Sequence, residues 1–405
     1  RTYSNYTIPY AYPVAISVHT DRIGMEYPMI CFNGGRPEAD GTYSEGTKYG
    51  MLGVIIHEVG HNFFPMIINS DERQWTWMDE GLNTFIQYLT EVEWDPNYPS
   101  RRGNPAKIVH YMKGDQATIA PIMTNSESIF QFGNNAYGKP ATALNILRET
   151  ILGRELFDFA FKTYAERWAY KHPTPADFFR TMEDASGVDL DWFWRGWFYG
   201  TDPVDISIDE VKLFTIDSKN PDKELAYKRA LNDAEPEFLG EQINAQTITS
   251  PVIKQKPDLK DFYNSWDRYE ATSYDREQYE NLLKGLTEEE KEVLGYDWNY
   301  YQIKFSNEGG LPMPIILEFI YEDNSKERHY IPAEIWKMDA QQVSKVFYSK
   351  KKLKEVILDP NLQTADIDRT DNYWPERMEQ SRFELYKNRG RYSRGDEPNP
   401  MQKAK

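Results

Sequence analysis

The sequence predicts an α+β protein in two parts, a strand-and-helix part over residues 1–203 and a β-rich part over residues 204–375. Three observations predict this class. Apolar and small residues alternate over residues 14–18, which is the period of a strand. Residues 105–200 read as mostly helical. After them, short segments of alternating polarity recur with turn residues between them, a spacing typical of a β-sandwich.

The first part is predicted to open with strands and to continue with two helices. A second extended run covers residues 25–32. Apolar residues then cover nearly every face of a helix predicted over residues 49–64, which favours a buried helix that ends at Pro65. Another helix is predicted to begin near Asp79, because the apolar residues after it follow the spacing of one helical face.

The second part is predicted to contain several short strands, with a helical insertion of about residues 258–294 after the first of them. The predicted strands cover residues 204–214, 299–306, 314–322, 327–332, 343–348 and 353–358. Thr287 and Glu290 have the sequence pattern of a helix capping box inside the insertion. Residues 376–405 form a polar tail, which is expected to be mobile.

Charge and composition exclude several classes of function. The formal net charge of −17 argues against nucleic acid as the main partner, since phosphate binding needs a basic surface. The single cysteine, Cys31, allows no internal disulfide. No apolar run approaches the roughly 18 residues that a membrane span needs. The opening residues Arg1-Thr2-Tyr3 read as the middle of a domain without a signal peptide, so a preceding region is expected to be missing.

The central motif of the sequence is His57-Glu58-Val59-Gly60-His61. On a helix, residues four apart share one face about 6 Å apart along the axis, so both imidazoles can reach one metal ion. Glu58 is rotated by about 100° from His57, where it can act as general base towards a water on that metal. Two core histidines beside an ordinary carboxylate are the simpler alternative, but burying such a set without a partner is costly. The motif therefore predicts a zinc site.

A catalytic zinc usually takes three protein ligands, and Glu80 is the candidate for the third. It lies 19 residues after His61, in the segment WMDEGL. An acidic residue is also favoured in the first turn of any helix, so Glu80 alone would not indicate a ligand. Together with the HExxH motif, however, this segment resembles the aminopeptidase N family of gluzincins. The resemblance implies one Zn²⁺ per chain, held by His57, His61 and Glu80. It also implies a thermolysin-like catalytic domain with a small mixed sheet and a large helical half.

Two further segments resemble this family. Residues 135–141 (NAYGKPA) are similar to its Tyr-x-Lys-Gly-Ala segment, which implies that Tyr137 donates its hydroxyl to the tetrahedral oxyanion. Gly24-Met25-Glu26 is similar to part of its Gly-Ala-Met-Glu-Asn motif, although tyrosine follows the glutamate here instead of asparagine. By this resemblance Glu26, with Gly24 and Met25 beside it, binds the free α-amine of the substrate.

The resemblance covers residues 14–204 well and the β-rich part only loosely. It implies that the family's N-terminal β-domain, a partner from the same protein, is missing here. Loose similarity to envelope-associated members favours a bacterial periplasmic or envelope location over the cytoplasm. Four histidines without companions at ligand spacing are expected to be structural or on the surface: His19, His110, His172 and His329.

The resemblance thus implies a zinc-dependent aminopeptidase that acts on peptides with a free N-terminus. Glu58 would take a proton from water and pass it to the leaving amine. Two alternatives stay open. One is a zinc endopeptidase or a hydrolase of a non-peptide substrate, which would not need Glu26. The other is a non-catalytic binding protein on the same fold, which would usually lack the base or a ligand, whereas this sequence has all four residues.

Overall fold

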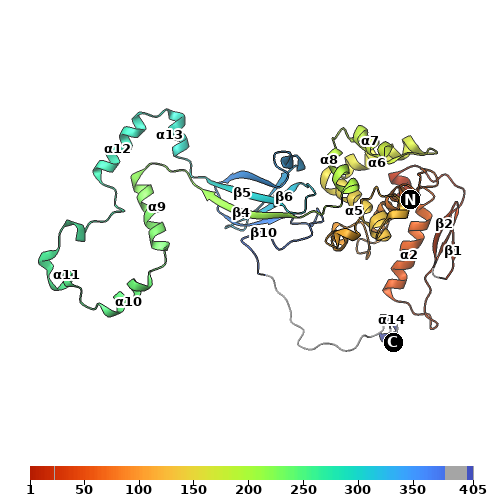
Figure 1. The fold of residues 1–405 in the computed structure, drawn as a ribbon, viewed down its shortest axis with the longest axis horizontal. Helices are drawn as coiled ribbons and strands as arrows, with labels where there is room; N and C mark the ends of the chain where they lie inside the picture. Colours follow the sequence, from red (N-terminus) through yellow and green to blue (C-terminus); the bar gives the residue numbers. More distant parts are fainter. Residues whose placement is uncertain (22, 379–398, 405) are drawn as a thin grey trace. The chain divides into compact units, whose positions relative to one another are not determined.

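The computed structural model of the protein describes residues 1–21, 23–378 and 399–404 (Figure 1). Its internal contacts divide the chain into two compact units. The first contains Arg1–Val211, Ile303–Lys345 and the residues from Leu353 onward, and the second contains Lys212–Gln302 and Val346–Lys352. Most of the polar tail predicted from residue 376 lies outside the described residues.

The N-terminal strands form a small mixed sheet, as the sequence predicted. Its strands are β1 (Ile16–His19), β2 (Gly24–Tyr27) and β3 (Ile30–Asn33), in the order β1-β3-β2. β1 runs parallel to β3 and β2 runs antiparallel to it. The single extended run predicted over residues 25–32 is in fact two strands, because the chain turns at Met29, whose φ is 66°.

The helix that carries the HExxH motif is α2 (Glu45–Gly60), four residues earlier than predicted at each end. It begins early because the Ser44 side chain accepts a hydrogen bond from Thr47 N at 3.0 Å, which caps the first turn. The chain leaves the helix at His61, before it reaches Pro65. The expectation of a fully buried helix is wrong, since most of its apolar side chains are only partly buried.

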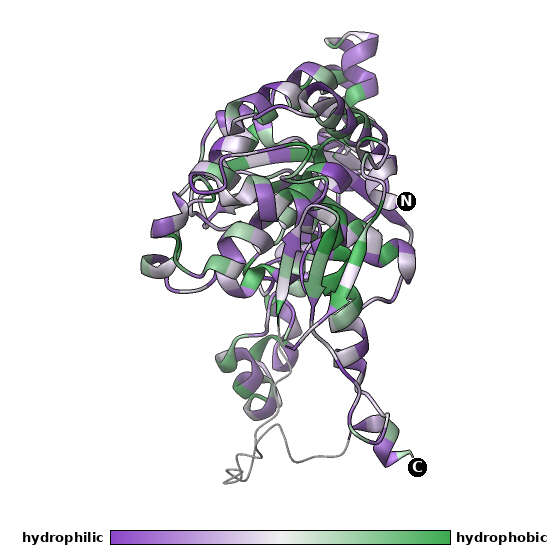
Figure 2. Cartoon of the chain, turned by 90° about the vertical axis from the view of Figure 1, so that its right-hand side faces the viewer, coloured by the Kyte–Doolittle hydropathy of each residue, from purple (hydrophilic) through white to green (hydrophobic). Residues whose placement is uncertain are grey.

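The predicted second helix is α3 (Leu82–Trp94), which follows a single π-helical turn, η1 (Trp77–Gly81). The prediction that residues 105–200 are mostly helical is confirmed. Hydrophobic and hydrophilic stretches alternate along the helices, as expected for helices with one buried face (Figure 2). The other helical elements of this part are α1 (Thr2–Tyr6), η2 (Pro105–Lys107), α4 (Val109–Met112), η3 (Gln116–Thr118), η4 (Ser126–Ser128), η5 (Gly133–Gly138), α5 (Lys139–Ile146), η6 (Leu147–Ile151), α6 (Arg154–Trp168), α7 (Pro175–Ser186), α8 (Asp191–Trp194) and η7 (Arg195–Tyr199).

An aromatic cluster holds η1 in place. Trp77 is 1% exposed and stacks on Phe179, with ring centroids 5.8 Å apart and an interplanar angle of 7°. The rings of Phe178 and Phe198 meet Trp77 edge-on, with centroids 5.6 and 4.9 Å away. These three phenylalanines belong to α7 and η7, so the packing of the helical part fixes the turn that carries Glu80.

Two further sheets are built from the strands after residue 203. One has the order β4-β5-β8, and the other, with antiparallel pairing, has the order β10-β9-β6-β7. Their bounds are β4 (Ile206–Phe214), β5 (Asn299–Asn307), β6 (Ile315–Tyr321), β7 (Lys326–Ile331), β8 (Gln342–Ser349), β9 (Leu353–Leu358) and β10 (Tyr373–Trp374). The predicted strands match β4 to β9 within two residues at every end, and only the short β10 was not predicted.

The helical insertion between β4 and β5 is longer than the predicted 258–294. It begins at Pro221, where Asn220 caps the first helix by accepting from Asp222 N at 3.0 Å. The insertion contains α9 (Pro221–Ala234), α10 (Leu239–Thr247), α11 (Val252–Gln255), η8 (Pro257–Leu259), η9 (Phe262–Asn264), α12 (Ser273–Lys284) and α13 (Glu288–Leu294). The short α14 (Pro400–Lys403) lies in the C-terminal segment. No helix in the described ranges is both long and apolar enough to cross a bilayer.

Candidate active site

α2 and η1 bring the two motif histidines and Glu80 together. His57 Nε2 lies 3.1 Å from His61 Nε2 and 3.0 Å from Glu80 Oε2. His61 Nε2 lies 3.5 Å from the same carboxylate oxygen. Ligands held by a tetrahedral zinc ion at about 2.0–2.1 Å are about 3.3 Å from one another, so this spacing fits zinc. Two imidazoles and one carboxylate are also a donor set that catalytic zinc takes.

Gln87 on α3 orients His57. The Nδ1 atom of His57 lies 2.8 Å from Gln87 Oε1. Gln87 Nε2 donates to Glu91 Oε1 at 2.8 Å and to Gly53 O at 3.2 Å, so Oε1 is the atom that accepts from His57. This bond places the histidine proton on Nδ1 and leaves Nε2 free for a metal. No motif in the sequence indicated Gln87, although polar residues recur at helical spacing from Glu80 to Glu91.

The backbone of Phe64 orients His61 in the same way. The Nδ1 atom of His61 lies 2.9 Å from Phe64 O, and Asp79 Oδ1 lies 2.9 Å from the same nitrogen, so Nδ1 carries a proton and Nε2 faces Glu80. His61 is only 1% exposed. Burial alone would lower the pKa of His61, but the hydrogen bonds and charges of Asp79 and Glu80 outweigh it and raise this pKa to about 11.

Four carboxylates crowd the two histidines. Burial, reinforced by the charges of Glu26 and Glu80, raises the pKa of Glu58 to about 8. Burial also raises the pKa of Asp79 to about 7. Burial acts in the same direction on Glu80, but hydrogen bonds from both histidines outweigh it and hold the pKa of Glu80 well below its usual range. A divalent cation at this point would favour the charged carboxylates and lower the raised pKa of Glu58, which frees Glu58 to act as a base.

Glu58 lies on the β2 side of His57, His61 and Glu80, the group that could hold a metal ion. It is 6% exposed, and its Oε2 atom has no hydrogen-bond partner among the described residues. A Cβ atom on Gly24 would lie 2.7 Å from Glu58 Oε1, so glycine is the residue that leaves this carboxylate its room. A buried carboxylate oxygen without a partner, next to a metal site, is suited to accept a proton from water.

Glu26 lies on β2 beside the same group. It offers a carboxylate oxygen within 4.8 Å of ligand atoms of His61 and Asp79. Successive side chains of a strand point to opposite faces, so Met25 points away from the face that carries Glu26. A contribution of Met25 to substrate binding would therefore come from its backbone.

Tyr137 in η5 lies on the other side of His57. Its ring stacks on the His57 ring, with centroids 5.7 Å apart and an interplanar angle of 25°. The guanidinium carbon of Arg102 lies 4.4 Å from the centroid of the Tyr137 ring. Burial and the charge of Glu80 raise the pKa of Tyr137 well above its usual value, so the hydroxyl keeps its proton. A protonated hydroxyl in this place can donate to a developing oxyanion.

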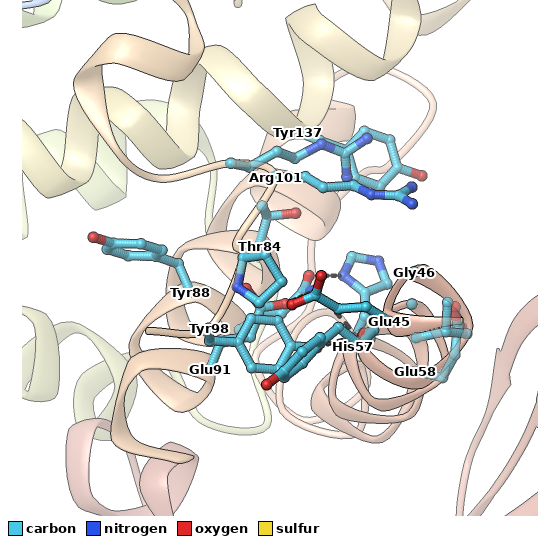
Figure 3. A pocket seen from close by; sticks show the side chains of 17 residues that line it. Glu45, Gly46, His57, Glu58, Thr84, Tyr88, Glu91, Tyr98, Arg101 and Tyr137 are labelled. Atoms are coloured by element: carbon cyan, nitrogen blue, oxygen red, sulfur yellow. Dashed lines mark hydrogen bonds between the residues drawn. The ribbon is translucent and has the colours of Figure 1, made fainter. Parts of the chain in front are cut away.

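A pocket of about 420 Å³ opens beside these side chains. Its walls come from α2, α3, residues 98–102 and Tyr137, and His57 and Glu58 line it (Figure 3). In Figure 3, Tyr137 and Arg101 lie on one side of the pocket, opposite Glu45 and His57. This volume is in the range of pockets that bind small ligands.

Two other side-chain groups in the described part of the chain could hold a metal ion. Glu26, His61 and Asp79 overlap the site above, and Glu183 with two exposed aspartates lies elsewhere. The histidines expected to be structural or on the surface take part in none of the groups found in the described ranges: His19, His110, His172 and His329.

Comparison with known proteins relates the first part of the chain to a family. Residues 2–197 match the Peptidase family M1 domain. Over 266 residues the chain is 25% identical to a protein named probable aminopeptidase 2 from Sulfurisphaera tokodaii, covering 63% of this chain and 33% of that protein. Over 200 residues it is 20% identical to aminopeptidase N from Lactococcus lactis subsp. lactis, covering 47% of this chain and 23% of that protein.

Among solved structures, that of Legionella pneumophila aminopeptidase A in complex with aspartic acid gives a TM-score of 0.47 at 14% identity, over 86% of this chain and 31% of that one. The present chain spans a third or less of the length of these three proteins. The match to the family model identifies residues 2–197 as a domain of peptidase family M1, the family of aminopeptidase N-like zinc metallopeptidases.

Proposed function

We propose that the chain carries the active site of a zinc aminopeptidase, which hydrolyses the first peptide bond of substrates with a free N-terminus. One observation carries the proposal. The ligand atoms of His57, His61 and Glu80 lie within 4.8 Å of one another, and the unpartnered carboxylate oxygen of Glu58 is buried beside them. The names of the relatives, which are aminopeptidases, support the same reaction.

In the proposed site, His57, His61 and Glu80 hold one zinc ion per chain. A zinc ion held there would supply Lewis-acid chemistry, which would polarise the scissile carbonyl and make a water molecule more acidic. Glu58 accepts the proton of that water on its buried carboxylate and passes it to the leaving amine. Tyr137 donates its O–H to the oxyanion.

Glu26 is proposed to bind the ammonium group of the first substrate residue, which fixes cleavage one residue from the end of the peptide. An ammonium ion here would offset part of the repulsion among Glu26, Glu58 and their neighbours. Gly24 contributes by leaving room for the Glu58 carboxylate, and Met25 through its backbone.

We further propose the domain boundaries that the sequence suggested. Residues 1–203 form a thermolysin-like catalytic domain, and residues 204–375 form a β-sandwich-like domain in which the sheets β4-β5-β8 and β10-β9-β6-β7 pack on each other. The helices between Pro221 and Leu294 are then an insertion in the second domain. The small mixed sheet with its helical half, followed by the two later sheets, supports this division.

Two residues distinguish the proposed aminopeptidase from the alternative functions. An endopeptidase, or a hydrolase of a non-peptide substrate, would have no use for an ammonium-binding carboxylate, and the position of Glu26 beside His61 favours the aminopeptidase. A non-catalytic binding protein would have no use for a general base. The buried Glu58, whose Oε2 atom has no hydrogen-bond partner among the described residues, favours catalysis.

The test uses the full chain purified without chelator and resupplied with zinc. Elemental analysis is expected to give one zinc per chain, and aminoacyl-coumarin amides are expected to be hydrolysed only when their amine is free. Glu58→Gln should keep zinc and lose at least ~10²-fold in turnover, whereas His61→Ala should lose the metal. Glu127→Gln, which changes an exposed surface carboxylate, is the control. A protein that binds no zinc would refute the proposal, and preference for N-acetylated peptides would favour the endopeptidase.

A further inference from the structure

The pocket next to the proposed zinc site has two arginines in its wall. It is lined by His57, Glu58 and Tyr137 of the site and by Arg101 and Arg102 of the segment that follows α3. Glu26 does not line it. Nothing in the proposed reaction assigns a role to the two guanidinium groups.

The position of Glu26 indicates which part of a peptide enters this pocket. Glu26 groups with His61 and Asp79, whereas the pocket lies against His57 and Tyr137. If the substrate's ammonium is at Glu26, as the proposed function has it, the chain crosses the metal-binding group and continues towards Tyr137. The pocket then receives the leaving part of the peptide, on the carboxyl side of the cleaved bond.

Arg102 forms no ion pair with the described residues, although the charges of Glu80 and Glu91 act on it from a distance. It is half-buried, and its guanidinium carbon lies 4.4 Å from the centre of the Tyr137 ring. In the described part of the chain, neither Arg101 nor Arg102 has a carboxylate within 4.0 Å or a side-chain hydrogen bond. Burial lowers the pKa of Arg102, as expected for a cation without a close counter-ion. A guanidinium group offers five N–H donors, and leaving them unpaired in a half-buried place is unfavourable.

The carboxylates that line the same pocket do not act as counter-ions for Arg102. Glu91 is 5% exposed and accepts from Gln87 at 2.8 Å, so it is already engaged behind His57. Glu45 lies across the pocket from Arg101 (Figure 3). An anion would be repelled from the side of Glu45 and attracted to the side of the arginines, which fixes its orientation.

We propose that Arg102, with the exposed Arg101 at the rim, binds a carboxylate in the leaving part of the peptide. The inference rests on the proposed function, because that function sets the direction of the substrate. The carboxylate has two possible sources. One is the C-terminus of a dipeptide or tripeptide, and the other is an acidic side chain next to the cleaved bond. Arginine forms bidentate, charge-assisted hydrogen bonds with a carboxylate of either kind.

The experiment compares matched substrates with the full zinc-loaded chain. Ala-Ala against Ala-Ala-amide tests the C-terminal carboxylate, and Ala-Glu-amide against Ala-Gln-amide tests the acidic side chain. An alanyl-coumarin amide, which has no carboxylate, reports the basal activity. The variants are Arg102→Met, Arg102→Lys and, as a control, Arg154→Met, which changes an exposed arginine paired with Glu149.

The native protein is expected to prefer the acid over its neutral partner by about 10–100-fold in kcat/KM in at least one pair, mainly through KM. Arg102→Met should reduce that ratio to near one, and Arg102→Lys should keep part of it. Arg154→Met should leave it unchanged. If Arg102 only supported Tyr137, its loss would lower kcat for acid and amide alike. A ratio within twofold in both pairs of the native protein would overturn the inference.

Calorimetry separates this inference from the proposed function. If the alanyl-coumarin amide is hydrolysed but no acid preference is found, the inference fails and the function stands. If nothing is hydrolysed, the proposed function fails. The inference about Arg102 is then tested by the binding of Ala-Ala and Ala-Ala-amide to Glu58→Gln, with and without Arg102→Met. Tighter binding of the acid in this pair, or in the pair Ala-Glu-amide and Ala-Gln-amide, that Arg102→Met abolishes supports the carboxylate site, and equal binding within both pairs refutes it.

Discussion

Replacement of Gln87 by methionine is expected to weaken zinc binding although it removes no proposed ligand. In the native protein Gln87 Oε1 accepts from His57 Nδ1 at 2.8 Å, and Gln87 Nε2 donates to Glu91 Oε1 at 2.8 Å and to Gly53 O at 3.2 Å. Methionine fills a similar volume without these groups. The variant therefore leaves His57 Nδ1 without its acceptor and the buried Glu91 with one donor fewer.

The size of the effect follows from these contacts. Loss of the outer partner of a metal-binding histidine typically costs about 10–100-fold in affinity, or ~1.4–2.7 kcal/mol. The unsatisfied buried groups should also cost about 1–3 kcal/mol of folding free energy. Gln87→Glu keeps an acceptor for His57 but places a second carboxylate next to Glu91. That variant should lose stability and retain most of its zinc affinity.

The assay is competition for zinc with a chromophoric chelator, together with thermal unfolding of the metal-free protein. Gln116→Met is the matched control, because among the described residues the Gln116 amide donates only to Met112 O, at 3.0 Å. If Gln87→Met bound zinc within twofold of the native protein while folded, the argument that Gln87 orients His57 would be wrong.

The oxyanion donor and a buried aspartate give two further tests. Tyr137→Phe should lower kcat by about 10²–10³-fold with little change in KM, and steady-state kinetics showing a change in KM alone would assign Tyr137 to substrate binding. Burial and the charge of Asp205 raise the pKa of Asp366 to about 8. The folded state therefore keeps a proton that the unfolded state loses above about pH 4, so stability falls as pH rises from about 4 to 8. The melting temperature of Asp366→Asn should exceed that of the native protein by a few degrees at pH 8 and by much less at pH 5. An equal difference at both pH values would contradict the raised pKa of Asp366.

The sequence could predict part of the candidate site because that part is local. His57 and His61 are four residues apart on one helix, so helical geometry alone brings their rings together. Glu80 is on another element, and its approach depends on the packing of Trp77 against residues about a hundred positions later. Sequence spacing could not predict that contact, so the family resemblance was needed to identify Glu80 as a ligand. Arg102 follows α3 in a segment without any period, so no pattern indicated it.

The errors in the predicted fold also have physical causes. The start of α2 was missed because the apolar pattern begins after the capped first turn at Ser44. None of the longer helices of the insertion has a buried residue, so none has a strong apolar period. The capping box at Thr287 and Glu290 indicated the later helices, whereas those between Pro221 and Gln255 were missed. In the β-rich part, burial alternates from residue to residue along β5, and the strand bounds were accordingly predicted well.

The pocket explains why α2 is apolar on nearly every face and yet only partly buried. One side of the helix packs against β2 and β3 and another against α3, and a third side lines the pocket with Gly46, Gly50 and Gly53, which share one face. A glycine inside a helix costs about 0.5–1 kcal/mol relative to alanine, so glycines on the pocket side favour a role in leaving space.

A Cβ atom on Gly50 would meet no atom within 4 Å. Gly50→Ala should therefore raise the free energy of unfolding by about 0.5–1 kcal/mol. It should also lower kcat/KM for peptides with a large leaving residue more than for those with a small one. Thermal unfolding and a series of alanyl peptides with leaving residues of increasing size measure both effects. If the variant were more stable and size made no difference, this face of α2 would not border the bound peptide.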